Sequence, residues 1–205
     1  MNDQKYTVAS VTPRLDQFLK PLLQKGGFQL SYEAAEGESV NPDFENPEVV
    51  VRFSGADVDL LLANKAELLL ALEYITMEAL RMPSEDHSRI SFDAQDYRAL
   101  RIEELRLSAA AAAEKVKRTG QPFKFNPMNS RERRVIHLAL RNETELRSES
   151  TGHGGFRQVV IYPAGMASLP EAPPPPAYQN SGRPPRERDR DRDHGRPRAQ
   201  GRGRR

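Results

Sequence analysis

The chain has 205 residues, of which 37% are hydrophobic and 29% charged, and it contains no cysteine and no tryptophan. The absence of cysteine excludes a disulfide-stabilised scaffold, a cysteine nucleophile and thiolate metal sites. No run of residues approaches the roughly 18 to 20 consecutive apolar positions that a membrane span needs, and the first residues are polar. We therefore expect a soluble, cytoplasmic protein.

The net charge of +2 hides an uneven distribution. Between Ser181 and Arg205 there are ten arginines and four acidic residues, whereas the preceding part is mildly acidic. Half of the 16 prolines lie in residues 164–205, where Leu169 is the only Leu, Ile, Val or Phe. We predict a disordered, Pro-rich and Arg/Gly-rich tail over 164–205. A basic arm of this kind is typical of attraction to polyanions, and the alternative is a charged tail that only keeps the protein soluble.

In the N-terminal half of the core, residues 12–94, the apolar residues first recur at the spacing of a helix. Further along, apolar and polar residues alternate or apolar residues follow one another, as in strands. Gly26 and Gly27 are a typical end of a helix. The predicted elements, in chain order, are a helix over 15–23, strands over 28–32 and 49–53, a brief helix over 60–62, a long helix over 67–81 and a strand over 89–93. The order is therefore α-β-β-α-α-β.

The long helix of this half has more apolar residues than one face can bury. Steps of four, three and four residues predict a core face formed by Leu68, Leu72, Ile75 and Ala79. A further apolar group is left over, and it is either ordinary core or a surface for dimerisation. Its members are Leu68, Leu69, Leu70, Tyr74 and Met77.

The second half, residues 95–163, begins with Asp93 to Asp96 as helix caps. The predicted elements are a helix to about residue 118 with a core stripe at Leu105, Ala109, Ala112 and Val116, a strand over 123–125, a helix over 131–141, and strands over 144–150 and 156–162. Asn129 and Glu132 have the spacing of a capping box at the start of the second helix. The order α-β-α-β-β completes an α+β protein.

The segment 130–141 concentrates basic groups on one side of its predicted helix. With about 100° per residue and Arg133 at 0°, His137 lies near 40°, Arg141 near 80° and Arg134 near 100°. Apolar residues occupy the remaining arc, so this helix can bury one side and present the other. A guanidinium fork beside an imidazole suits a phosphate group. The alternative is a solvated face on which His137 only packs along its edge.

The spacing Arg133-x-x-x-His137, on a helix that follows a long helix and a short strand, resembles the R-three-H domain, a small module that binds single-stranded nucleic acid. The resemblance extends through Met128-Asn129, Glu132-Arg133-Arg134, Ser150-x-Gly152 and Arg157. With the preceding half, the chain resembles the bacterial Jag family (also called KhpB or EloR), in which a type II KH domain precedes the R-three-H domain. Members often carry a further N-terminal domain, whereas about 11 residues precede the KH-like part here.

KH domains clamp a nucleic-acid backbone with a Gly-x-x-Gly loop, because glycine lets a phosphate approach backbone amides. The corresponding residues here are Ala63-Asn64-Lys65-Ala66. The two methyl groups are expected to crowd a phosphate and to stiffen the loop, while Asn64 and Lys65 retain outer contacts. The resemblance implies that this half binds RNA weakly or contacts protein instead, with a small KH-domain partner or a second copy of the chain.

Other signals point away from catalysis. Gly152-His-Gly-Gly155 is similar to an oxyanion loop of esterases, but the chain has no Gly-x-Ser-x-Gly elbow to supply a nucleophile. His87, His153 and His194 lack metal-ligand spacing. No enzyme activity, metal or cofactor is expected.

These observations favour a protein that binds single-stranded RNA through the Arg133/His137 face, with single-stranded DNA as the alternative ligand. Arg134, Arg141, Lys124 and Arg157 are predicted to add phosphate contacts, and the resemblance implies post-transcriptional regulation. A different reading is a protein-interaction adaptor whose affinity for RNA is incidental.

Overall fold

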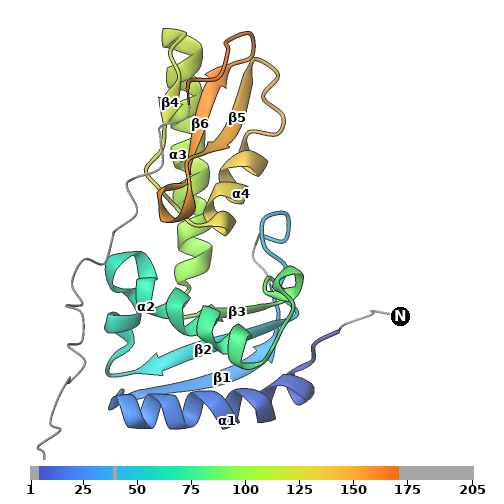
Figure 1. Ribbon diagram of the computed structural model, residues 1–205, viewed down its shortest axis with the longest axis vertical. Coiled ribbons are helices and arrows are strands. Elements are labelled where there is room, and N and C mark those ends of the chain that lie inside the picture. The colour runs from blue at the N-terminus through green and yellow to red at the C-terminus, as the bar shows by residue number, and fades with distance from the viewer. Residues whose placement is uncertain (1–4, 39–40, 171–205) are drawn as a thin grey trace, which may run out of the picture. The chain divides into compact units, whose positions relative to one another are not determined.

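The computed structural model describes residues 5–38 and 41–170 and confirms the predicted α+β class (Figure 1). The elements are α1 (Val8–Gly26), β1 (Leu30–Glu36), β2 (Val49–Gly55), α2 (Val58–Ala79), η1 (Ser84–Asp86), β3 (Ile90–Asp93), α3 (Tyr97–Thr119), β4 (Phe123–Lys124), α4 (Ser130–Ala139), β5 (Leu146–Thr151), η2 (Gly154–Phe156) and β6 (Gln158–Pro163). Within the described ranges, no helix is both long enough and apolar enough to cross a bilayer.

The first sheet has the strand order β1-β2-β3, with β1 and β2 antiparallel and β2 and β3 parallel. Alternate side chains of these strands, such as Val49, Val51 and Phe92, join one hydrophobic core with Leu15 of α1 and Leu69 of α2. Both helices therefore cover the same face of the sheet. The observed order agrees with the predicted α-β-β-α-α-β, because α2 consists of two helical segments that meet at a kink.

Helix α1 begins at Val8, upstream of the predicted boundary at residue 12. Thr7 and Ser10 form a capping box in which each side chain accepts from the other's backbone N–H, and this satisfies the first free amides of the helix. Tyr6 is buried, and its hydroxyl donates to Asp86 at 2.9 Å. The core stripe of α1 also begins earlier than predicted, because Val11 is buried one turn before Leu15.

The predicted core face of α2 is confirmed at Leu72 and, in part, at Leu68, which packs against the core, but it is wrong at Ile75 and Ala79. Leu69, Leu72 and Thr76 are buried, whereas Ile75 is 41% exposed and Ala79 lies at the surface. The physical reason is Glu73, a charged residue that lies on the core side of the helix and is buried there. Met77 and Leu69 belong to the ordinary core, and Tyr74 is 60% exposed. A dimerisation role for the exposed part of α2 remains a prediction.

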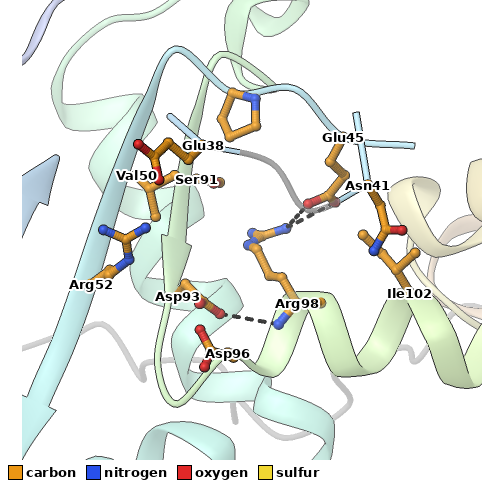
Figure 2. A pocket seen from close by; sticks show the side chains of 12 residues that line it. Glu38, Asn41, Glu45, Val50, Arg52, Ser91, Asp93, Asp96, Arg98 and Ile102 are labelled. Carbon is orange, nitrogen blue, oxygen red and sulfur yellow. Dashed lines mark hydrogen bonds and ion pairs between the residues drawn. The ribbon is translucent and has the colours of Figure 1, made fainter. Parts of the chain in front are cut away.

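Glu73 can be buried because two arginines neutralise it. Arg98, at the start of α3, contacts Glu73 Oε2 at 2.5 Å, and Arg131 of α4 contacts Glu73 Oε1 at 3.1 Å. The backbone N–H of Phe92 also donates to Glu73 Oε2 at 2.7 Å. Figure 2 shows Arg98 reaching towards Glu45, which it meets at 3.1 Å, while its backbone N–H donates to Asp93. We call Glu73, Arg98, Arg131 and Glu45 the Glu73 network.

The second sheet is antiparallel, with the order β4-β6-β5, and α3 and α4 cover one of its faces (Figure 1). The predicted stripe on α3 is confirmed, since its four residues are all buried in a second hydrophobic core. Ala109 and Ala112 are small, which lets the neighbouring elements approach α3 closely. The predicted order α-β-α-β-β is confirmed as well.

Residues 164–170, predicted to belong to a disordered tail, instead fold back on the second sheet. Arg147 donates through Nη2 to the carbonyl oxygen of Met166 at 2.6 Å, and Ser168 donates to Glu149 at 2.8 Å. The backbone N–H of Leu169 donates to the hydroxyl of Tyr162 at 3.2 Å. Polar contacts hold this segment, so apolar patterning does not detect it. The rest of the predicted tail, 171–205, lies outside the described residues.

Candidate nucleic-acid interface

Helix α4 is held in place at its start. Asn129 and Glu132 form the predicted capping box, with Asn129 Oδ1 accepting from the N–H of Glu132 at 2.9 Å. Glu132 also accepts from Arg101 Nε at 2.6 Å, which ties the first turn of α4 to α3. Val135 and Ile136 bury the opposite side of the helix in the second core. The side that carries Arg133 and His137 is thereby directed at β5.

Arg133 and His137 meet two serines of β5. Arg133 Nη1 donates to Ser150 Oγ at 3.0 Å, and His137 Nε2 lies 2.9 Å from the same oxygen. His137 Nδ1 lies 2.7 Å from Ser148 Oγ. Ser148 and Ser150 are two residues apart on a strand, so both point to the same side of the sheet. We call these four residues the Arg–His–Ser cluster.

Arg133 gives the cluster a half-buried positive charge. No counterion for this charge lies in the described part of the chain. None of the described carboxylates forms an ion pair with Arg133, and its Nε is buried without a hydrogen-bond acceptor there. Burial and the neighbouring positive charge of Arg157 lower the pKa of Arg133. Burial, followed by the charge of Arg133, also lowers the pKa of His137. The imidazole is therefore neutral at pH 7, with one nitrogen donating and the other accepting.

The pKa of His137 gives a first prediction. We expect it to lie below the ordinary 6.5, and Arg133→Ala to raise it, because the variant removes a positive charge and admits water. Below about pH 6.5 the unfolded chain takes up a proton before the folded chain does, so this group lowers the free energy of unfolding until the folded imidazole also protonates. NMR titration of the imidazole signals measures both values, and an unshifted pKa in Arg133→Ala would contradict the assignment.

Of the other predicted basic residues, Arg157 lies next to the cluster. Its positive charge acts on Arg133, and its carbonyl oxygen accepts from the N–H of Met128 at 3.0 Å, just before α4. Arg134 is exposed and lines a pocket with Arg131 instead.

The placement of Arg141 on the same helix face is wrong, because α4 ends at Ala139 and Leu140 caps it. Arg141 lies 3.8 Å from Asp43 instead.

The structure also separates Lys124 from the cluster. Lys124 and Glu149 both pair with Val160 of β6, so they share the face of the sheet opposite to Ser148 and Ser150. The side chain of Lys124 lines a groove of about 420 Å³ beside β4. The sequence shows that Lys124 lies close to α4 along the chain, but only the strand register shows which face it occupies.

The predicted nucleic-acid loop of the first half adopts an unusual backbone. Asn64, Lys65 and Ala66 have φ values of 52°, 61° and 58°, three consecutive left-handed residues without a glycine. Ala66 is buried, while Asn64 and Lys65 are exposed. The hydroxyl of Tyr97 donates to the carbonyl oxygen of Lys65 at 2.8 Å and holds the turn from α3. Asn64 and Lys65 thus belong to the first half, whereas the Arg–His–Ser cluster belongs to the second.

This loop gives a second prediction. A side chain in the left-handed region costs about 1 kcal/mol, so Lys65→Gly should raise the free energy of unfolding by roughly 0.5 to 1 kcal/mol. The matched control is Ala71→Gly, at an exposed position inside the same helix, which should lower it by about 1 kcal/mol. Urea denaturation measures both variants. If Lys65→Gly and Ala71→Gly lower the free energy of unfolding by the same amount, the left-handed turn is contradicted.

A pocket of about 100 Å³ beside β2 is a poor alternative site for an anion (Figure 2). It is lined by four carboxylates and only two guanidinium groups, and one of these, Arg98, is already paired with Glu45. The described residues also include no group of three His, Asp or Glu side chains arranged to hold a metal ion.

Two features of the site differ from the sequence-based expectation. Ser148 is not among the predicted site residues, although a Ser-x-Ser pair on a predicted strand places both hydroxyls on one face. The prediction that Phe156 begins a strand is wrong, since Phe156 ends the turn η2 and is 62% exposed beside Arg157.

Known proteins share parts of this sequence. Residues 103–163 match the R-three-H domain. Three bacterial relatives are each named RNA-binding protein KhpB. The relative from Clostridium symbiosum is 35% identical over 60% of this chain and 55% of its own length. The relative from Bacillus subtilis is 30% identical over 72% of this chain and 73% of its own length. The relative from Lactiplantibacillus plantarum is 29% identical over 58% of this chain and 37% of its own length.

The match to the Clostridium symbiosum relative thus spans little more than half of that protein. The match to the Bacillus subtilis relative includes residues outside the R-three-H domain, because it covers 152 residues. The order of helices and strands predicted from the spacing of apolar residues is also the one observed. The chain belongs to the KhpB (Jag) family and carries its R-three-H domain.

Proposed function

We propose that this protein binds single-stranded RNA, with a phosphate group held at the Arg–His–Ser cluster. Arg133 supplies charge and donors, His137 a neutral directional donor, and Ser150 a hydroxyl that both of them contact. Arg157 adds a second guanidinium beside them. The chemistry is recognition without bond making, so the proposed role is binding and not catalysis.

The observation that carries this proposal is the arginine without a counterion. Most arginines near the core of this protein are paired with a carboxylate, as in the Glu73 network, whereas Arg133 meets only a serine hydroxyl among the described residues. A half-buried guanidinium is costly unless an anion offsets its lost hydration. A bound phosphate would supply that charge and further acceptors.

The choice of RNA as the ligand is supported by the names of the relatives, which are RNA-binding proteins. A role in post-transcriptional regulation is part of the same proposal. DNA presents the same phosphates, so the strand type has to be measured. Fluorescence anisotropy with labelled RNA and DNA oligonucleotides of one sequence, each single-stranded and duplex, tests the proposal. Equal affinity for all four would leave only nonspecific attraction to phosphate.

A third prediction concerns the C-terminal arginines. Ten arginines against four acidic residues between Ser181 and Arg205 should add a sequence-independent attraction that salt weakens. Truncation after Pro170 keeps the segment that packs on the second sheet, and it should flatten the slope of log affinity against log salt concentration by about 0.7 for each phosphate the arm touches. A full-length variant with the ten arginines replaced by glutamine should behave alike. An unchanged slope in both would show that the arm does not contact RNA.

A further inference from the structure

The turn that follows β5 brings an aromatic ring to the Arg–His–Ser cluster. Ser150, which contacts both Arg133 and His137, is followed two residues later by Gly152 with φ of 90°. A Cβ atom on Gly152 would lie 2.6 Å from the carbonyl oxygen of Phe156, so only glycine permits this close return of the backbone. The turn therefore fixes Phe156 beside the end of the strand that carries Ser150.

The ring of Phe156 is 62% exposed, although a phenylalanine usually gains by burial. The other large apolar side chains that are strongly exposed in the described ranges lie on α2 and α3, whereas Phe156 lies in the turn that follows β5. Those others are Leu60, Tyr74, Ile75, Leu100 and Leu107.

A positively charged residue directly follows Phe156 in the chain. The next residue, Arg157, acts electrostatically on Arg133, and its backbone is bonded to Met128 at the start of α4. The turn after β5 thus carries an exposed aromatic residue directly before an arginine whose charge reaches Arg133. Nucleobases of single strands stack on aromatic side chains while basic residues hold the adjacent backbone. In a duplex the bases stack on each other and offer no free face.

We propose that Phe156 is the stacking surface for an unpaired nucleobase whose neighbouring phosphate lies at the Arg–His–Ser cluster. This inference rests on the proposed function and adds to it a base-contacting residue. It also gives a physical cause for a preference for single strands. Stacking uses the flat face that every base has, so the contact should tolerate all four bases.

Tryptophan fluorescence tests the contact directly, because the chain contains no tryptophan. Phe156→Trp places a single indole at the proposed stacking position, and a single-stranded octauridylate should quench its emission with the same midpoint as binding measured by anisotropy. The matched control is Leu107→Trp on α3, a position that is 63% exposed, whose emission should not change. Equal quenching of both, or quenching of neither while the strand binds, would overturn the inference.

An abasic octamer, which has the same phosphates and no bases, separates this inference from the proposed function. Phe156→Ala should weaken binding of octauridylate by about 5- to 150-fold and leave binding of the abasic strand unchanged, whereas Phe156→Tyr should bind as the wild type. If the wild type binds both strands equally and Phe156→Ala has no effect, stacking is refuted and the phosphate site stands. If the wild type binds neither strand, the proposed function fails and the inference fails with it.

Discussion

Replacing both Arg133 and His137 by alanine should weaken single-stranded RNA binding by about 1 to 3 kcal/mol, or roughly 5- to 150-fold. The two side chains share Ser150 Oγ as a contact, at 3.0 Å and 2.9 Å, so they present one surface to the ligand. Their removal takes away charge-assisted hydrogen bonds to phosphate. The apolar side of α4 remains intact, so the domain should stay folded. Fluorescence anisotropy with a labelled oligonucleotide measures the loss.

Two further variants show whether geometry or charge is responsible. Arg133→Lys keeps the charge but loses the planar fork of donors, so its loss of affinity should lie between those of the wild type and Arg133→Ala. Arg118→Ala removes one positive charge at the exposed end of α3, and it should have little effect. If Arg118→Ala weakens binding as much as the double variant, net charge rather than the Arg–His–Ser cluster determines affinity.

The fold could largely be predicted from the sequence because its elements have regular apolar periods. The stripe at Leu105 and Val116 on α3 is confirmed, and so is the capping box at Asn129. The failures occur where polar groups take the place of apolar ones. Glu73 occupies a core position of α2, and residues 164–170 attach to the second sheet mainly through hydrogen bonds. Hydrophobic patterning detects neither feature.

The proximity of site residues could be predicted only where the residues lie on the same element. Arg133 and His137 lie one turn apart on α4, and their proximity follows from helix geometry alone. The end of the helix removes Arg141 from this face, and the strand register removes Lys124. Ser148 and Phe156 come from other elements. Their positions depend on how β5 and the following turn pack, which the sequence does not reveal.

The Glu73 network joins α2, α3 and α4, and its disruption should have the largest effect on stability. Glu73→Ala should lower the free energy of unfolding by about 3 kcal/mol, because it leaves two mostly buried guanidinium groups without their shared carboxylate. The N–H of Phe92 also loses its acceptor. The expected loss lies at the low end for buried pairs, since Arg98 keeps its contact with Glu45. Urea denaturation followed by circular dichroism measures the change.

Two control variants separate the causes of that loss. Glu73→Gln keeps the size of the side chain and an oxygen that can accept from Phe92, so any loss it shares with Glu73→Ala reports the missing charge. Glu103→Ala removes an exposed carboxylate paired with Arg106 on α3, and it should change stability by less than about 1 kcal/mol. From most to least stable, the expected order is therefore wild type and Glu103→Ala, then Glu73→Gln, then Glu73→Ala.

If Glu73→Ala is as stable as Glu103→Ala, solvent reaches the network and the burial of Glu73 contributes nothing. The reason for the expected order is that water can hydrate the exposed Arg106 after its partner is removed, whereas the side chains of Arg98 and Arg131 are only 13% and 25% exposed.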